Sequence, residues 1–366
     1  MKRFRNYYTN LAIIILNTIL IFAIFEIFAR VVLFHLVPES KFLRFKLPDE
    51  WPRKSLKLTP HPYLSYSTTP GYINFNNGRK EFVHNSLGFR GDEITKIKKN
   101  GVFRIVALGG STTYTSGTAL NSNTYPSLLE KVLIDKYHYS NIEVINAGVP
   151  GYTSWESLVN FQFRVLDLNP DLIIVYHGTN DTHARLVHPM VYQSDNTGSR
   201  KHWENPSIPF WEYSVLARFF ARLRIDKPPS ENDFTGAITA HNPGPNPMET
   251  LRQNPPTYFK RNLSNIIAIA KHNNIKIMFA TWASSPNLGY AKLKHYKKGF
   301  SETVEIVQQL GSRNAIPVFE FHKLMPTDSK YWIDGIHVNS KGSLIKAELF
   351  AKFIMQKRLI PDALRK

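Results

Sequence analysis

The first forty residues run from a basic start through a long apolar stretch. From position 11 to position 29 only three polar residues interrupt the apolar ones: Asn17, Thr18 and Glu26. A helix of about 20 residues crosses the hydrocarbon layer of a bilayer, and no pair of small residues marks a cleavage site after the run. We therefore expect a cytoplasmic stub and a transmembrane anchor in residues 1–36, with lipid contact through residues 11–36.

Charges around this helix predict its orientation. Lys2, Arg3 and Arg5 precede the apolar run, and basic residues stay on the cytoplasmic side of a membrane. The N-terminus is then cytoplasmic, and the remainder of the chain lies outside the cytoplasm at the cell membrane. Glu26 is costly in lipid, so we expect it near the outer boundary, paired with Arg30 one turn further on.

Residues 37–101 carry many prolines and aromatic side chains but few periodic runs. Freely disordered linkers rarely contain so many aromatic residues. We therefore expect a connector that packs on the rest of the protein. Asn85, Gly88 and Gly91 near its end are typical turn residues.

From residue 102 onward, short apolar runs alternate with helical periodicity. The apolar runs predict strands at 103–108, 142–145, 172–176, 275–280 and 316–321. Helices are expected at 124–137, 153–166, 258–272, 299–310 and 340–355. Such alternation is typical of an α/β domain with a parallel sheet covered on both faces, here over residues 102–366.

An insertion at about residues 183–257 interrupts this alternation. Within it, the segment 210–225 is amphipathic. Its apolar positions share one face of a helix: Trp211, Val215, Leu216, Phe219, Phe220 and Leu223. Its cations are Arg218, Arg222 and Arg224. A basic amphipathic helix can act as a lid, bind a membrane surface or pack on its own domain, and the sequence leaves these three roles open.

Composition limits the classes of binding partner and the kinds of site chemistry that this chain can have. The 46 Lys and Arg residues exceed the 28 Asp and Glu residues, and the net charge is +18. This excess favours an anionic neighbour, but no zinc-finger spacing or basic aromatic run indicates nucleic acid. Lipid head groups or an acidic glycan remain. The absence of cysteine excludes disulfides, thiol nucleophiles and thiolate metal sites.

Chemically useful residues follow the predicted strands. The first strand ends in Gly109-Gly110-Ser111. Gly148 and Gly151 follow the second strand, and Asn180 follows the third. Asp334 and His337 stand before the last helix. Since sites in parallel sheets form at the carboxyl ends of the strands, we expect these residues to meet there.

These residue types are the ones that acyl transfer needs. A serine hydroxyl such as that of Ser111 needs an adjacent base. His337 can take its proton, and the Asp334 carboxylate can orient the imidazole. Expected donors to the oxyanion are the N–H groups of Ser111 and Gly151 and the side-chain amide of Asn180. Since the base must be neutral, activity should rise with pH as His337 loses its proton.

The ordered blocks Gly-x-Ser, Asn-x-Gly-x-x-Gly, Gly-x-Asn-Asp and Asp-x-x-His resemble those of the SGNH (GDSL-type) hydrolase superfamily, over about residues 102–357. The resemblance implies a flavodoxin-like three-layer sandwich with a central five-stranded parallel sheet. It also implies Ser111 as nucleophile, His337 as base, Asp334 as the third triad member, and Asn180 and Gly151, rather than Gly148, in the oxyanion hole. The family's common first block is Gly-Asp-Ser. Gly110 replaces that aspartate here, so the local hydrogen bonding must differ.

Other residues near these blocks have two interpretations. Tyr114, Tyr152 and Trp155 could line a substrate pocket or simply pack. His177 and His183 flank Asn180, but no third ligand has recognisable spacing, so we expect no metal and no cofactor. Asp181 is expected to belong to the turn or helix cap.

Three functions follow. The first is a serine esterase that removes a small acyl group, acetyl above all, from a glycan or lipid-linked substrate. The second is an O-acyltransferase of polysaccharide or cell-wall modification, which would use a membrane-bound acyl-donor partner. The third is an inactive binding or assembly protein that keeps the fold.

Overall fold

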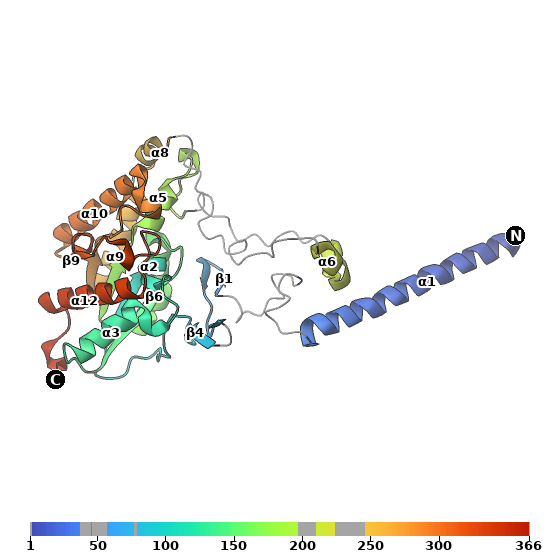
Figure 1. The fold of residues 1–366 in the computed structure, drawn as a ribbon, viewed down its shortest axis with the longest axis horizontal. Coiled ribbons are helices and arrows are strands. Elements are labelled where there is room, and N and C mark those ends of the chain that lie inside the picture. Colours follow the sequence, from blue (N-terminus) through green and yellow to red (C-terminus); the bar gives the residue numbers. More distant parts are fainter. Residues whose placement is uncertain are drawn as a thin grey trace. The chain divides into compact units, whose positions relative to one another are not determined.

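The protein divides into two compact units. The computed structural model describes residues 2–36, 45, 57–76, 79–196, 210–223 and 246–365. One unit comprises Met1–Leu56 with Glu204–Phe234, and the other comprises Lys57–Trp203 with Thr235–Lys366 (Figure 1). Residues of the expected connector (37–101) and of the expected insertion (about 183–257) occur in both units.

Five parallel strands form the sheet of the larger unit. They are β5 (Phe103–Gly109), β6 (Ile142–Gly148), β7 (Leu172–Tyr176), β8 (Lys276–Ala280) and β9 (Val318–Phe319). Their spatial order is β6-β5-β7-β8-β9, which is the flavodoxin-like order 2-1-3-4-5. The predicted fold class is thereby confirmed.

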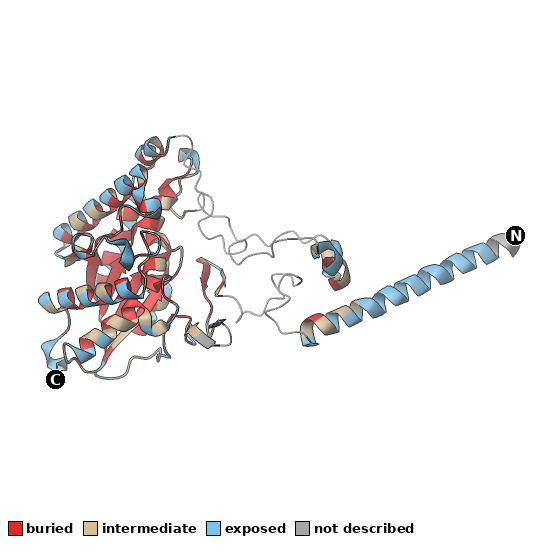
Figure 2. Ribbon diagram, viewed as in Figure 1, coloured by how far each residue is buried: buried red, intermediate tan, exposed pale blue. Residues whose placement is uncertain are grey.

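Alternate side chains of the strands enter two separate cores. In β5, Ile105 and Ala107 belong to one core, and Val106 and Leu108 belong to the other. Helices α3 (Tyr125–Asp135) and α12 (Ser340–Gln356) cover the first face, and α4 (Ser154–Asn160) and α9 (Thr257–His272) cover the second. The strands are consequently buried in the middle layer of a three-layer sandwich (Figure 2).

Three predicted elements differ in extent from the observed ones. The helix expected at 153–166 ends as α4 at Asn160 and continues as a π-helical turn, Phe161–Val165, and a short 3-10 turn. The helix expected at 299–310 is the longer α10 (Lys294–Asn314). The strand expected at 316–321 contains only Val318 and Phe319, because α11 (Phe321–Leu324) begins directly after it and Phe321 packs on Phe350.

The described part of the connector packs on the rest of the larger unit. It forms two antiparallel hairpins, β1 (Leu58–His61) with β2 (Ser65–Thr68) and β3 (Ile73–Asn76) with β4 (Arg79–Val83). The Tyr66 hydroxyl donates to the Pro150 carbonyl over 2.7 Å, and the Tyr152 hydroxyl donates to the Tyr66 carbonyl over 2.6 Å. The remaining connector residues, 37–44, 46–56 and 77–78, lie outside the described residues.

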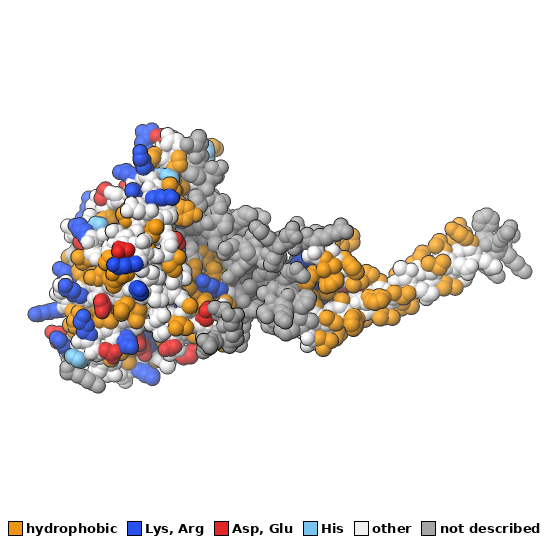
Figure 3. Space-filling model, in the orientation of Figure 1, with side chains coloured by type: hydrophobic (Ala, Val, Ile, Leu, Met, Phe, Trp, Pro, Cys, Tyr) orange, Lys and Arg blue, Asp and Glu red, His pale blue; other side chains and the backbone are white. Residues whose placement is uncertain are grey.

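The smaller unit begins with a long apolar helix. Helix α1 (Lys2–Val31) continues into a π-helical turn, Val32–Leu36. An 18-residue stretch within Asn6–Leu36 has a mean hydropathy of 2.6 and none of it is buried, and hydrophobic side chains cover the helix (Figure 3). Among the described residues, it is the helix long and apolar enough to cross a membrane. The expected contact of Glu26 with Arg30 is present at 2.8 Å.

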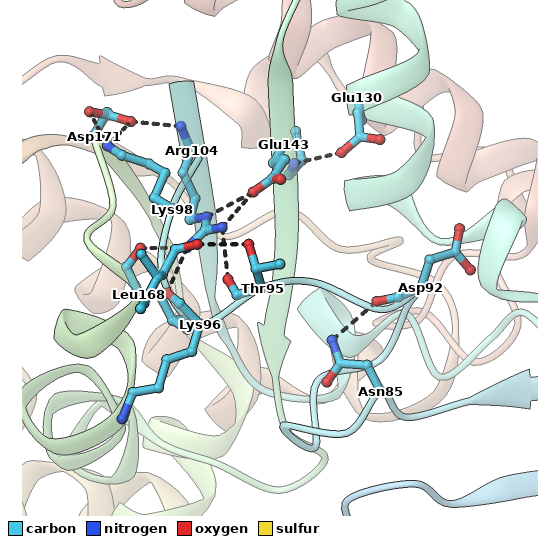
Figure 4. Close-up of polar contacts among 12 residues, drawn as sticks. Asn85, Asp92, Thr95, Lys96, Lys98, Arg104, Glu130, Glu143, Leu168 and Asp171 are labelled. Carbon is cyan, nitrogen blue, oxygen red and sulfur yellow. Dashed lines mark hydrogen bonds and ion pairs between the residues drawn. The ribbon is translucent and has the colours of Figure 1, made fainter. Parts of the chain in front are cut away.

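A buried guanidinium joins β5 and the edge strand β6 to neighbouring loops (Figure 4). Arg104 of β5 is fully buried. Its Nε donates to Glu143 of β6 over 2.8 Å, and its terminal nitrogens donate to the carbonyls of Leu168, Thr95 and Lys96 over 2.6, 3.0 and 3.2 Å. Removing this group would leave several buried acceptors without a donor.

We expect Arg104→Met to destabilise the protein by about 3 kcal/mol, since breaking a buried ion pair leaves an uncompensated charge. Denaturant or thermal unfolding of the variant measures this loss. Lys96→Met is the matched control because the Lys96–Asp167 pair is half exposed, and it should cost less than about 1 kcal/mol. Equal stabilities of the two variants would contradict the role given to Arg104.

Candidate active site

The register of the sheet brings three loops to one edge. Gly109 at the end of β5 lies opposite Gly148 of β6 and opposite Tyr176 of β7. The three strands therefore end level with one another. Ser111, Gly151 and Asn180 follow these ends by a few residues each, so the fold places them at the same rim.

Three side chains form a hydrogen-bonded relay at this rim. Ser111 is the first residue of α2 (Ser111–Tyr114). Its Oγ lies 2.7 Å from Nε2 of His337, and Nδ1 of His337 lies 2.7 Å from Oδ2 of Asp334. Ser111 and His337 are both partly exposed, so a substrate can reach the hydroxyl.

The loop that carries His337 is held by the same carboxylate. Oδ1 of Asp334 accepts the backbone N–H groups of Ile336 and His337 over 3.1 and 2.9 Å. Partial burial raises the pKa of Asp334, but the hydrogen bond and charge of the His337 ring and these two N–H groups outweigh it. The pKa therefore lies below its ordinary value of 3.8. Gly335 has φ +91°, and a Cβ there would lie 2.5 Å from the Leu288 carbonyl.

The three expected oxyanion donors lie in the segments that follow β5, β6 and β7. Asn180 lies in α5 (Thr179–Arg185), and its Nδ2 donates to the Tyr152 carbonyl over 2.8 Å. A primary amide has a second N–H to give. The N–H of Ser111 stands at the first position of α2, where a helix leaves its N–H groups without an intrahelical acceptor. Gly151 adopts φ +83°, beside Tyr152.

Gly148 and Gly110 lie where neighbouring atoms leave no room for a side chain. The N–H of Gly148 donates to Oδ1 of Asn146 over 3.1 Å, and a Cβ on Gly148 would lie 2.2 Å from the N of Tyr114. A Cβ on Gly110 would lie 2.6 Å from Nδ2 of Asn180 and 2.9 Å from the Tyr152 carbonyl. Any side chain at position 110 would push on the Asn180 amide, which is a physical reason for glycine in place of the family's aspartate.

Two of the three expected pocket residues do not line a pocket. Tyr114 and Tyr152 are fully buried. The Tyr114 hydroxyl lies 2.8 Å from Nε2 of His84, and the Tyr152 hydroxyl donates to Tyr66. Both side chains pack in the interior, where each hydroxyl has a hydrogen-bond partner. Trp155, the third, is partly exposed at the start of α4.

The GDSL-like Lipase/Acylhydrolase family matches residues 107–345 of this chain, which is well over half of its length. The chain belongs to this family. It is accordingly a hydrolase of ester bonds, and the resemblance seen in its sequence motifs is confirmed.

Individual relatives are more distant. A Bacillus subtilis protein described as uncharacterized lipoprotein YqeF is 35% identical over 78 residues, which is 21% of this chain and 31% of the relative. The match to the lipase/acylhydrolase from Enterococcus faecalis (18% identity, TM-score 0.42) covers 70% of this chain and 97% of that protein. A GDSL-like lipase from Bacteroides thetaiotaomicron (16%, TM-score 0.40) covers 69% and 88%.

A buried carboxylate connects two of the loops of this acylhydrolase. Oδ1 of Asp181 accepts the backbone N–H and the hydroxyl of Ser154 over 2.9 and 2.6 Å. Ser154 begins α4, three residues after Gly151, and Asp181 follows Asn180. The carboxylate therefore sets the distance between the two expected oxyanion donors. Sequence alone could not separate this role from an ordinary helix cap.

A histidine shares this buried site with Asp181. His177 Nε2 lies 2.8 Å from the Ser157 hydroxyl, and its Nδ1 lies 3.6 Å from Asp181 Oδ2. Burial raises the pKa of Asp181 to about 7 and lowers the pKa of His177 to about 3. His183 instead packs edge-on against Tyr290 and Tyr296. The described residues contain no group of three or more side chains suited to a metal ion.

Two buried basic side chains contact the turn that carries Ser111 and the residues after it. Nζ of Lys346 in α12 donates to the Thr112 carbonyl over 3.1 Å and lies 4.0 Å from the ring centres of Tyr125 and Tyr176. Burial lowers the pKa of Lys346 well below its ordinary value. The Arg90 guanidinium donates to four carbonyls that follow α2: Tyr114, Thr115, Thr118 and Ala119. The sequence motifs identified neither residue.

We predict that Asp181→Asn changes the pH dependence of stability. Between the ordinary pKa of 3.8 and the folded value of about 7, the folded state holds a proton that the unfolded state has lost. Raising the pH through this window therefore destabilises the wild-type protein. The asparagine keeps an oxygen for Ser154 but does not titrate, so the variant should lose less thermal stability between about pH 5 and about pH 8.

Asp135→Asn serves as the control, because Asp135 is exposed at the end of α3 and its replacement should leave the wild-type profile unchanged. Parallel pH profiles of Asp181→Asn and wild type would show that burial does not raise the pKa of this carboxyl.

Proposed function

We propose that this acylhydrolase is a membrane-anchored serine esterase that acts outside the cytoplasm and removes a small acyl group, acetyl above all, from a glycan or a lipid-linked substrate. The observation that carries the proposal is the unbroken relay from the Ser111 hydroxyl through His337 to Asp334, with the Asn180 amide beside it.

The relay supports a two-step hydrolysis. Ser111 Oγ attacks the ester carbonyl as Nε2 of His337 takes its proton, and the ionised Asp334 stabilises the imidazolium. The carbonyl oxygen, now negative, receives hydrogen bonds from the N–H groups of Ser111 and Gly151 and from the Asn180 amide. His337 then returns the proton to the leaving alcohol. Water repeats the sequence on the acyl-enzyme, and the acid leaves with Ser111 restored.

Packing and charge support the substrate class. The buried side chains of Thr113, Tyr114 and Tyr152 fill the interior behind Ser111, which favours a short acyl group over a long chain. The net charge of +18 favours an acidic glycan or a surface of anionic lipid head groups. Helix α1 would hold the enzyme at such a surface.

Transfer to a sugar hydroxyl would use the same acyl-enzyme, with the sugar in place of water and a membrane-bound partner as acyl donor. The described contacts show no feature that would exclude water from the relay, so hydrolysis is the function we propose. The intact relay also favours an enzyme over an inactive binding protein.

We expect Ser111→Ala to abolish hydrolysis of an activated acetate ester and labelling by a fluorophosphonate, because both reactions need the hydroxyl. Ser116→Ala is the matched control, since Ser116 lies exposed just after the same helix and should keep both activities. Mass spectrometry of an acetylated oligosaccharide should show free acetate and no acyl group moved to a second glycan. Turnover by Ser111→Ala, or acylated acceptor without free acid, would contradict the esterase.

Asp334→Asn should lower kcat by about 10³- to 10⁴-fold, as losses of the orienting carboxylate do in other triads. The asparagine oxygen can still accept the N–H groups of Ile336 and His337. Its NH₂ would face Nδ1 of His337 and favour the tautomer that cannot take a proton from Ser111. Steady-state kinetics measure the loss. Asp328→Asn, at an exposed turn, should behave as wild type, and a near-wild-type kcat for Asp334→Asn would remove Asp334 from the mechanism.

A further inference from the structure

The amphipathic segment of the insertion docks on the apolar helix through one carboxylate. Helix α6 (Val215–Arg222) begins after Ser214. The Glu26 side chain accepts the backbone N–H groups of Val215 and Leu216 over 2.9 and 3.0 Å and the Ser214 hydroxyl over 2.8 Å. These first N–H groups of a helix have no partner within the helix, and a negative charge is favourable there.

Arg30 completes this junction. Its Nε donates to Glu26 over 2.8 Å, and its Nη2 donates to the Tyr213 carbonyl over 2.6 Å. Glu26 and Arg30, one turn apart on α1, therefore hold the residues before α6 and its first turn at the same time. The carboxylate that would be costly in lipid accepts four hydrogen bonds, from Arg30 Nε, the Ser214 hydroxyl and the N–H groups of Val215 and Leu216.

Apolar contacts support the same junction. Leu33, Phe45 and Val215 form a buried cluster, and the rings of Phe45 and Phe219 lie 5.0 Å apart. One side of α6 is therefore occupied by residues at the end of α1 and just after it. This settles where part of the apolar face packs, which the sequence left open.

The junction lies near the outer end of the residues needed to cross a bilayer. About 20 helical residues cross the hydrocarbon layer, so a span that starts at Leu11 ends at Arg30, and Glu26 lies about 6 Å inside that end at 1.5 Å per residue. If α1 crosses the bilayer as proposed, α6 meets it at the boundary between acyl chains and head groups. Aromatic side chains are enriched at this depth.

The rest of the apolar surface of α6 and the turn before it has no cover in the described structure. Phe210 is 87% exposed and Phe220 is 64% exposed. Further exposed members of this surface are Trp211, Tyr213 and Leu223. The charged side chain of Arg222 does not depend on this apolar surface, because it forms an ion pair with Glu212. The exposed surface is continuous with α1 through the Glu26 junction.

We propose that residues 210–223 lie in the outer interface of the membrane that α1 spans, with Phe210, Trp211 and Phe220 in lipid. The occupant of the exposed surface is the bilayer itself. The proposal rests on the membrane anchoring given under the proposed function. The insertion then returns the chain to the membrane, so that the anchor consists of a spanning helix and an interfacial helix joined by Glu26.

The chain contains no cysteine, so single cysteines can report the position of each element. The full-length protein is placed in vesicles of phosphatidylethanolamine and phosphatidylglycerol, with a nitroxide on Phe220→Cys. Ile19→Cys on α1 is the lipid control, and Ile97→Cys, 86% exposed in the catalytic unit, is the water control. Collisions with oxygen, which dissolves in lipid, and with a water-soluble nickel chelate are measured by electron paramagnetic resonance.

We expect the label at position 220 to favour oxygen over nickel, as the label at position 19 does. A label at 220 that meets nickel as often as the one at 97 would overturn the interfacial helix while leaving the anchor intact. A label at 220 shielded from both reagents would also overturn it, because protein would then cover the surface. A water-exposed label at position 19 would remove the anchor and this proposal together.

Glu26→Ala tests the junction in the same assay. Losing the acceptor of three α6 donors should raise the mobility of the label at 220 and its collisions with nickel. Asn17→Ala is the matched control, since Asn17 is an exposed polar side chain of α1 beside Thr18, and it should change neither. An unchanged spectrum for Glu26→Ala would show that Glu26 does not hold α6.

Discussion

The level ends of β5, β6 and β7 are the constraint on which the site depends. Parallel pairing sets Gly109 opposite both Gly148 and Tyr176, and each strand is followed within a few residues by one component of the site. A shift of one residue in either pairing would move a loop by about 3.3 Å. Such a shift is more than the range of a hydrogen bond allows.

Buried polar groups then hold these loops at fixed distances. Asp181 ties the start of α4 to α5, Lys346 holds the carbonyl of Thr112, and Arg90 holds the chain after α2. Each is a charged or titratable group taken from water, which costs free energy unless its partners are well placed. Their common effect is a rigid surround for Ser111, and rigidity of this kind keeps donors aimed at the oxyanion without reorganisation.

In the smaller unit, hydrogen bonds likewise offset the cost of removing a charged group from water. Glu26 would be costly in lipid, but the first turn of α6 and Arg30 supply its hydrogen bonds. A helix of eight residues is too short to be stable alone in water. Docking on α1 and burial of Val215 supply part of what it lacks, and the proposed lipid contact supplies more.

Much of the catalytic unit could be predicted from its sequence because local signals carry it. Apolar runs of four to six residues, glycines at strand ends and the order of four short blocks were enough to predict a parallel sheet and the residues at its rim. The long apolar run of α1 was equally plain. The roles of Tyr114 and Tyr152 could not be predicted, since the sequence pattern around an aromatic residue near a site is the same whether its side chain lines a pocket or packs in the interior.

Only the tertiary structure decided the contacts between distant segments. Ser111 and His337 are 226 residues apart, Lys346 reaches Thr112 across 234, and Glu26 reaches Leu216 across 190. No local pattern encodes such pairs, because each depends on how whole helices and strands pack. The sequence determined which elements form and which residues could do chemistry, and the packing determined which of those residues meet.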